Sequence, residues 1–222
     1  TCSFTCYLFM SNLPTYAPDL PQGAVWALVV VRISGLRALS KMTAIDFVVT
    51  VALGTLLGNG ATVDAAFGAR PLYEADLLVR VKDAAINNAK TPAEVLAHVD
   101  QVIPFIELPD LVVESPPKLN GAGISAINVG ARLGVRGTPL VVPADAAGQA
   151  RLLDQLRDMN VRLVDAQGAQ LGGGKGSDVL GHPLNAVVWL AGALKEQGLS
   201  MRPGQVISLG SFSALLQPKP GL

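Results

Sequence analysis

Charged side chains are distributed very unevenly along this chain of 222 residues. Residues 1–60 contain only five of the 34 charged residues, whereas residues 61–222 contain the other 29. A segment so poor in charge has to be buried against other apolar surface or placed in a lipid bilayer. We therefore divide the chain into an atypical apolar segment, residues 1–53, and one α+β domain, residues 54–222.

Two apolar blocks, residues 24–31 and 44–57, lie in or at the end of the N-terminal segment. Both are shorter than the roughly 20 residues that a membrane-spanning helix needs, and the second contains the charged Asp46. Residues 1–10 are apolar but lack the basic start and the small-residue cleavage site of a signal peptide. On composition alone, the two blocks are typical of a buried core.

The composition of the whole chain excludes several classes of protein. Half of the residues are apolar, which excludes a disordered chain. The 17 basic residues are balanced by 17 acidic ones, so we expect no nucleic-acid partner. Cys2 and Cys6 are too few for a disulfide scaffold or a four-ligand zinc site. A globular protein of the cytoplasm is the expectation that remains.

Apolar periodicity and capping residues predict the elements of the α+β domain. Thr91, Pro92 and Glu94 have the pattern of a capping box with proline in the first turn, which predicts a helix from there to about Val102. Residues 121–131 fit either a helix or a loop, and residues 168–176 form a glycine-rich loop. The other predicted helices are 149–159 and 182–197, and the predicted strands are 75–81, 102–108, 111–113, 137–142, 161–165 and 205–209.

Glu74 and Asp76 are two residues apart at the start of a predicted strand, so both carboxylates lie on one face of it. Two carboxylates on an apolar strand repel each other unless a proton or a cation lies between them. A hard divalent cation is the simplest solution, and Glu107, in another apolar run, is a third candidate ligand. The alternative is a solvated strand edge together with a turn at Glu107.

The segment from Gly172 to Pro183 reads GGGKGSDVLGHP. Glycines let a backbone approach a ligand, Lys175 adds a positive charge, and a helix is predicted to begin at His182. A carboxylate or an enolate could bind there, although the spacing does not match a phosphate-binding P-loop. The alternative is a flexible hairpin followed by an ordinary helix start.

Residues 54–222 resemble bacterial 2-keto-4-pentenoate hydratases and 4-oxalocrotonate decarboxylases, a branch of the fumarylacetoacetate hydrolase superfamily. The resemblance rests on RPLYEADLLV at 70–79, VIPFIEL at 102–108 and GKGSDVLGHPLNAVVWL at 174–190. It implies an α+β fold, the fumarylacetoacetase C-terminal-like mixed β-roll with flanking helices. Compared with that family, we expect the domain to be clipped at both ends.

The resemblance also implies a site and a reaction. In that family, an E-x-E pair and a third glutamate hold Mg²⁺ or Mn²⁺, and Glu74, Asp76 and Glu107 match those positions, with Asp76 one methylene shorter. The implied activity is addition of water to a 2-keto-4-enoate of the 2-hydroxypenta-2,4-dienoate type, in the degradation of aromatic compounds. The candidate catalytic residues implied by the resemblance are Asn128, Lys175, Ser177 and His182.

Several alternatives stay open. A decarboxylase of the 4-oxalocrotonate type would use the same ligands, and a non-catalytic partner subunit of such a decarboxylase complex would need no turnover. Residues 24–57 resemble a membrane segment of YetF-type inner-membrane proteins, through the string RISGLRALSKMTAIDFVVTVALG, which would make the chain a membrane-tethered fragment. That segment takes the place where the hydratase family has an active-site lysine and threonine. We expect a homo-oligomer that binds a small 2-keto acid.

Overall fold

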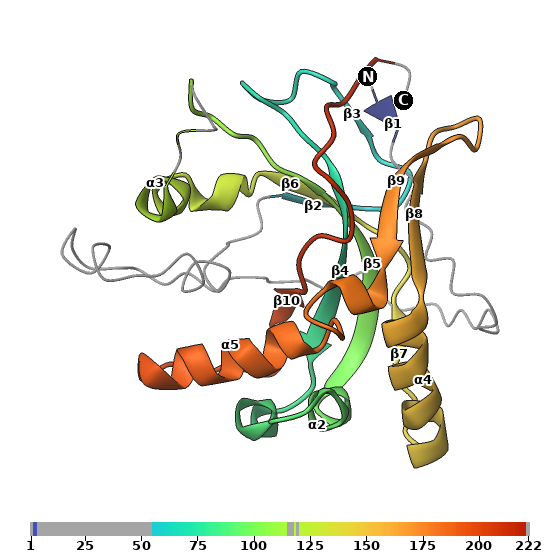
Figure 1. Cartoon of the computed structure of the whole chain (residues 1–222), viewed down its shortest axis with the longest axis vertical. Helices are drawn as coiled ribbons and strands as arrows, with labels where there is room; N and C mark the ends of the chain where they lie inside the picture. The colour runs from blue at the N-terminus through green and yellow to red at the C-terminus, as the bar shows by residue number, and fades with distance from the viewer. Residues whose placement is uncertain (1, 4–54, 115–117, 119, 221–222) are drawn as a thin grey trace.

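The computed structural model describes residues 2–3, 55–114, 118 and 120–220. Its centre is a mixed sheet with the strand order β10-β4-β5-β6-β2, in which β7 also pairs with β5 (Figure 1). Strand β2 pairs with β6 in parallel, and the other neighbours are antiparallel. The strands are β2 (Thr55–Leu57), β4 (Glu74–Val81), β5 (Val99–Leu108), β6 (Leu133–Arg136), β7 (Leu140–Val141) and β10 (Val206–Ser208).

The two faces of the sheet are covered differently. On one face, the odd-numbered residues of β4 pack into the main core together with three helices: α2 (Pro92–Ala97), α4 (Ala146–Asp158) and α5 (Asn185–Glu196). On the other face, Leu78, Ile103, Phe105 and Val206 form a smaller apolar cluster. Side chains alternate along a strand, so each strand contributes to both clusters. The polar residues of β4 and β5 that alternate with the main core therefore lie on this second face.

The glycine-rich segment is a strand and not the loop that the sequence predicted. Strand β9 (Gln170–Lys175) pairs with β8 (Asn160–Val164) as an antiparallel hairpin, a second sheet that lies beside β4 (Figure 1). A Cβ at Gly174 would lie 2.2 Å from the carbonyl oxygen of Phe212, and one at Gly176 would lie 1.8 Å from that of Leu156. The glycines thus allow the backbone to approach the chain's own backbone.

Local sequence signals located most elements but misjudged several ends. Thr91 caps α2 as predicted, since its side chain accepts from the Glu94 N–H at 3.2 Å, but the helix ends at Ala97. Strand β5 begins at Val99 and runs through Pro104, because pairing with β4 along its length outweighs continuation of the helix. Pro104 lies in the gap between the partners β6 and β7, where its missing N–H breaks no pairing.

Three further predictions concern shorter segments. The strand expected at 111–113 is absent from the described residues, and that expected at 137–142 is reduced to β7. Residues 121–131 contain a helix, α3 (Gly121–Ala126), and a 3-10 turn, η3 (Asn128–Gly130). The remaining short elements are β1 (Cys2–Ser3), β3 (Thr62–Val63), η1 (Ala84–Asn88) and η4 (Gly176–Asp178).

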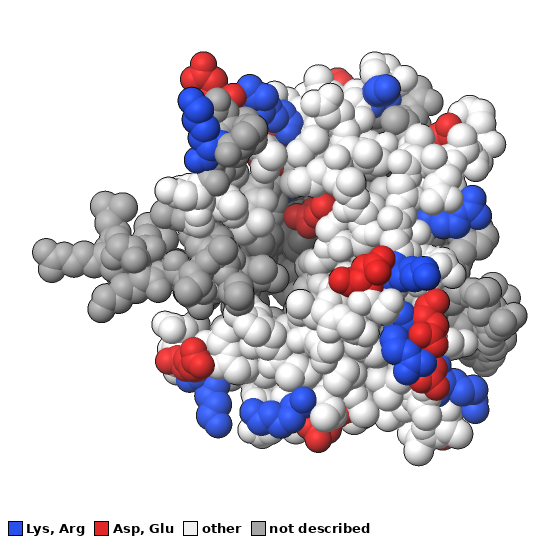
Figure 2. All heavy atoms as spheres, viewed as in Figure 1, with Lys and Arg blue, Asp and Glu red and all other residues white. Residues whose placement is uncertain are grey.

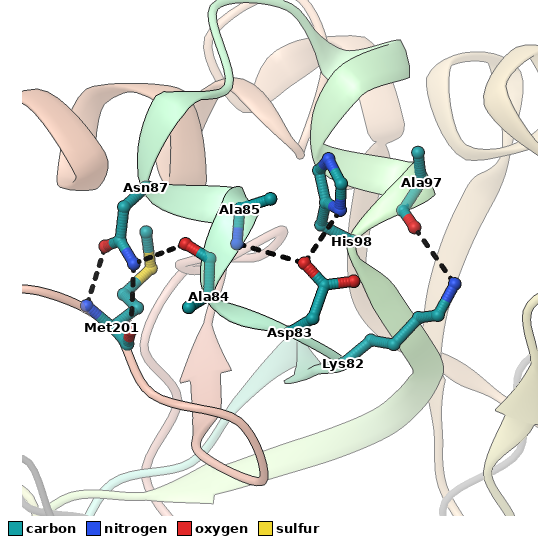
Figure 3. Close-up of polar contacts among 8 residues, drawn as sticks. All are labelled: Lys82, Asp83, Ala84, Ala85, Asn87, Ala97, His98 and Met201. Carbon is teal, nitrogen blue, oxygen red and sulfur yellow. Dashed lines mark hydrogen bonds and ion pairs between the residues drawn. The ribbon is translucent and has the colours of Figure 1, made fainter.

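Polar contacts join neighbouring elements where β4 ends and β5 begins (Figure 3). Asp83 caps η1 by accepting from Ala85 N at 3.0 Å, and its Oδ1 lies 2.9 Å from His98 Nδ1 at the end of α2. The Asn87 side chain accepts from the N–H of Met201 at 2.7 Å and donates to its carbonyl at 2.8 Å. These bonds connect η1 to the segment that leads into β10.

The N-terminal apolar blocks lie outside the described residues except for Thr55–Leu57, which form β2. Within the described part of the chain, no helix combines the length and the apolar character that crossing a membrane requires. On the face drawn in Figure 2, basic and acidic side chains are scattered and mixed.

Candidate active site

Three carboxylates lie on the less covered face of the sheet. Glu74 on β4 is the direct cross-strand partner of Glu107 on β5, and Asp76 is the partner of Phe105. Because antiparallel partners point to the same side, Glu74, Asp76 and Glu107 share the face of the small apolar cluster. We call these three residues the carboxylate cluster.

Burial raises the pKa of every member of the carboxylate cluster. Desolvation, reinforced by the charge of Glu74, raises the pKa of Glu107 to about 7. Desolvation also raises the pKa of Glu74, and the Ser211 hydroxyl lowers it by a smaller amount. Asp76 is only 4% exposed, and its pKa is well above the ordinary value, chiefly through desolvation and in part through the neighbouring charges. Negative charge is therefore unfavourable here without a cation.

The segment that follows β10 supplies serines to this site. Ser208 Oγ donates to Asp76 Oδ2 at 2.5 Å. The Ser211 hydroxyl lowers the pKa of Glu74, although its Oγ donates to the Ser213 carbonyl at 2.6 Å. Ser213 Oγ accepts from the Ala75 N–H at 3.0 Å. Nothing in the sequence indicated which acidic residues these serines lie near. That information comes from the pairing of β10 with β4.

An apolar wall borders the carboxylate cluster. Phe105 is buried, and Gly134 on β6 is the cross-strand partner of Glu107. A Cβ at Gly134 would lie 2.1 Å from Cζ of Phe105, so the ring covers the space above this glycine. The wall holds water away from one side of the cluster, which is consistent with desolvation as the main cause of the raised pKa values.

The donor chemistry of the cluster fits a hard divalent cation, because carboxylate oxygens are the ligands that Mg²⁺, Mn²⁺ and Ca²⁺ prefer. A cation would also offset the repulsion between Glu74 and Glu107. In the described part of the chain, however, no three His, Cys, Asp or Glu side chains already converge to hold a metal ion. The complete three-carboxylate ligand set stays a prediction.

Asn128 lies in η3, in a backbone turn of unusual conformation. Its φ is 52°, followed by 57° at Val129 and 77° at Gly130. Asparagine tolerates the left-handed region, whereas a β-branched valine does so only under constraint. One constraint is the bond from Asp110 N to Gly130 O at 2.8 Å, which ties η3 to the end of β5. The role of half-buried Asn128 near a substrate stays a prediction.

Lys175, Ser177 and His182 lie at the β9–η4 end of the hairpin and at the approach to α5. Lys175 and Ser177 are exposed, and the Lys175 N–H is bonded to Asp178 Oδ2 at 2.7 Å. No hydrogen bond in the described part of the chain joins Lys175, Ser177 or His182 to the carboxylate cluster. Their catalytic roles stay predictions.

His182 has a clear role in the fold. Its Nδ1 accepts from Leu184 N at 3.1 Å, so Nε2 carries the proton and donates to the Leu153 carbonyl at 3.2 Å. Desolvation lowers the pKa of this histidine, which keeps the ring neutral. His182 therefore joins the approach to α5 to α4. Together with the packed glycines, this supports the hairpin alternative over an anion site.

The chain is similar in sequence to two kinds of bacterial enzyme. It is 29% identical over 163 residues to a 4-oxalocrotonate decarboxylase of Pseudomonas putida, which covers 73% of this chain and 58% of that protein. It is 26% identical over 168 residues to a 2-keto-4-pentenoate hydratase of Paraburkholderia xenovorans strain LB400, which covers 74% and 57%. The chain thus spans less than three fifths of the length of these relatives. No family model matches it.

Two solved structures share the fold. A 4-oxalocrotonate decarboxylase from Pseudomonas putida G7, complexed with calcium and acetate, superposes with a TM-score of 0.61 at 28% identity, over 75% of this chain and 59% of that one. The same enzyme with magnesium and adipate gives 0.60 at 26% identity, over 75% and 57%. The predicted fold class is thereby confirmed. The YetF-type resemblance of residues 24–57 finds no support among these relatives.

Proposed function

We propose that this chain carries the site of a metal-dependent lyase, which adds water to a 2-keto-4-enoate of the 2-hydroxypenta-2,4-dienoate type. The observation that carries the proposal is the register of β4 and β5. It sets Glu74 opposite Glu107, with Asp76 on the same face, in a fold shared with a magnesium-bound decarboxylase. The similar hydratase and the calcium and magnesium in the similar structures support it.

The carboxylate cluster would hold Mg²⁺ or Mn²⁺. When bound, such an ion would accept the carboxylate and keto oxygens of a 2-keto acid and stabilise the negative charge of its enolate. Glu74 and Glu107 provide negative charge for that ion. The smaller apolar cluster, which contains Phe105, Ile103 and Leu78, keeps the surroundings low in dielectric. Ser208 donates to Asp76 and fixes the orientation of its carboxylate.

The test is consumption of 2-hydroxypenta-2,4-dienoate, followed by its ultraviolet absorbance, with Mg²⁺ or Mn²⁺ and then with EDTA. We expect metal-dependent loss of the dienoate signal, and at least about a hundredfold loss of kcat/KM in Glu107→Gln, because a ligand is removed. Glu196→Gln, an exposed position on α5, is the control and should match the unchanged protein. Absence of turnover and of metal-dependent thermal stabilisation would reject the proposal.

Decarboxylation is a second candidate, favoured by one observation: the two solved structures described above are of a 4-oxalocrotonate decarboxylase. The same carboxylate cluster would serve, because the enolate left after loss of CO₂ needs the same stabilisation. Release of CO₂ from 4-oxalocrotonate, measured under the same metal conditions, separates the two reactions. Release of CO₂ without hydration would assign the site to the decarboxylase.

A further inference from the structure

Both oxygens of the Asp76 carboxylate are already bonded within the protein. Oδ1 accepts from the N–H of Leu77 at 2.5 Å, and Oδ2 accepts from Ser208 Oγ at 2.5 Å. Only 4% of this residue is exposed. Its carboxylate therefore points into contacts between β4 and β10, which are adjacent strands of the sheet.

Glu74 and Glu107 are in a different situation. They are direct partners across β4 and β5, and both are half-buried. No hydrogen bond within the described part of the chain holds the Glu107 carboxylate. Each glutamate also reaches about one carbon–carbon bond, roughly 1.5 Å, farther from its strand than an aspartate does. These two side chains are thus the ones free to turn toward a common ion.

We propose that Ser208 is a positioning residue that holds Asp76 against β10, so that a divalent ion here is bound by Glu74 and Glu107 and not by Asp76. The inference rests on the proposed function, since it concerns the same site and narrows its protein ligands from three to two. It agrees with the absence of three converging ligand side chains from the described residues. Water or substrate oxygens would complete the coordination of the ion.

Mn²⁺ binding, measured by titration calorimetry on the full chain, tests this without relying on turnover. We expect Glu107→Gln to weaken binding by about a hundredfold or more, and Asp76→Asn to leave the Kd within about twofold. Ser213→Ala is the matched control, since Ser213 belongs to the same segment but bonds the backbone of Ala75. Unfolding in EDTA verifies that each variant is folded.

Ser208→Ala gives an independent result if Asp76→Asn does not fold. If Ser208 holds Asp76 away, its removal frees a third carboxylate, and Mn²⁺ binding becomes tighter. If Ser208 instead orients a ligating Asp76, its removal weakens binding by about 10–100-fold. The second result would overturn the inference, and so would an Asp76→Asn variant that is as impaired as Glu107→Gln.

In both cases Mn²⁺ still binds the unchanged protein, so the proposed function survives. Absence of Mn²⁺ binding to the unchanged protein would reject both.

Discussion

At the scale of single residues, the pKa values of the carboxylate cluster depend strongly on the surroundings of each side chain. Glu107 and Asp76 project from strands on which their neighbours on that face include the apolar Phe105 and Leu78. Burial raises the pKa of Asp76 more than the hydrogen bond from Ser208 lowers it, and burial together with the charge of Glu74 raises the pKa of Glu107. Without a cation, ionisation of these carboxyl groups is unfavourable in the folded protein. The free energy of unfolding therefore depends on pH.

We predict that the metal-free protein loses stability as the pH rises from about 5 to 8. A carboxyl group whose pKa is raised by folding contributes most below its unfolded pKa, and its contribution is lost as the pH passes the folded value, about 7 for Glu107. The loss due to Glu107 is up to about 3 kcal/mol. Urea unfolding in EDTA across this range measures it.

Glu107→Gln isolates the effect, because the glutamine has no charge to desolvate. Its free energy of unfolding should fall less over the same pH range, whereas the exposed Glu196→Gln should follow the unchanged protein. His182 acts in the opposite direction in all three proteins, since burial lowers its pKa. Parallel curves for Glu107→Gln and the unchanged protein would contradict the raised pKa of Glu107.

Gly134 is required by the neighbouring ring and not by its own backbone conformation. An added Cβ would lie 2.1 Å from Phe105 Cζ, so Gly134→Ala must displace a buried ring beside Glu107. We predict a loss of about 1–3 kcal/mol in the free energy of unfolding. Gly192→Ala on α5, where no atom lies within 4 Å of the added Cβ, should stabilise the protein by about 0.5–1 kcal/mol. Chemical denaturation compares the two, and equal effects would refute the steric explanation.

At the scale of helices and strands, neighbouring elements are connected by side chains that hydrogen-bond residues far away in the chain. Asn87 on η1 forms two bonds with the backbone of Met201, in the segment that leads into β10 (Figure 3). The register of β10 matters for the site, because Ser208 reaches Asp76 from that strand. The bonds between Asn87 and Met201, which lie outside the site, therefore support the position of Ser208 within it.

Removal of the Asn87 side chain should leave backbone groups of Met201 without their partner. We predict that Asn87→Ala lowers the free energy of unfolding by about 1–3 kcal/mol. Asn88→Ala is the matched control: this neighbour is exposed and should change stability by less than about 0.5 kcal/mol. Thermal unfolding checks both variants, and a neutral Asn87→Ala would show that water replaces these bonds.

For the molecule as a whole, Asp110 connects three segments. It is 2% exposed and accepts from Ala69 N at 3.1 Å, from Arg70 N at 2.7 Å and from Arg132 at 3.2 Å. Its own N–H bonds Gly130 O at 2.8 Å. The loop before β4, the end of β5 and the turn that contains Asn128 are thereby joined at one carboxylate.

Asp110→Ala should be strongly destabilising, because it leaves two backbone N–H groups and an arginine without their acceptor. The expected loss is about 3–5 kcal/mol in urea unfolding. Asp64→Ala, in the same loop but exposed, removes one bond to Ala66 N and should cost about 0.5–1 kcal/mol. A loss in Asp110→Ala no larger than in Asp64→Ala would contradict the connecting role of Asp110.

The sequence alone was sufficient to predict features that depend on residues close together in the chain. The alternation around Ala75 put Glu74 and Asp76 on one strand face, and Thr91 marked the start of α2. The three matching strings implied a fold that the similar structures confirm. Each of these signals is local, since a strand's period and a helix cap are set by residues a few positions apart.

Features that join distant segments required the folded molecule. Glycines 172–174 suggested a ligand loop, yet they form a strand because Phe212 and Val161 lie against them. Pro104 is tolerated inside β5, because it lies opposite Leu77 of β4 and between the stretches of β5 that pair with β6 and β7. The bond from Ser208 to Asp76 spans 132 residues. No local pattern encodes such a contact, because it forms only once β10 has paired with β4 and both side chains face the same side of the sheet.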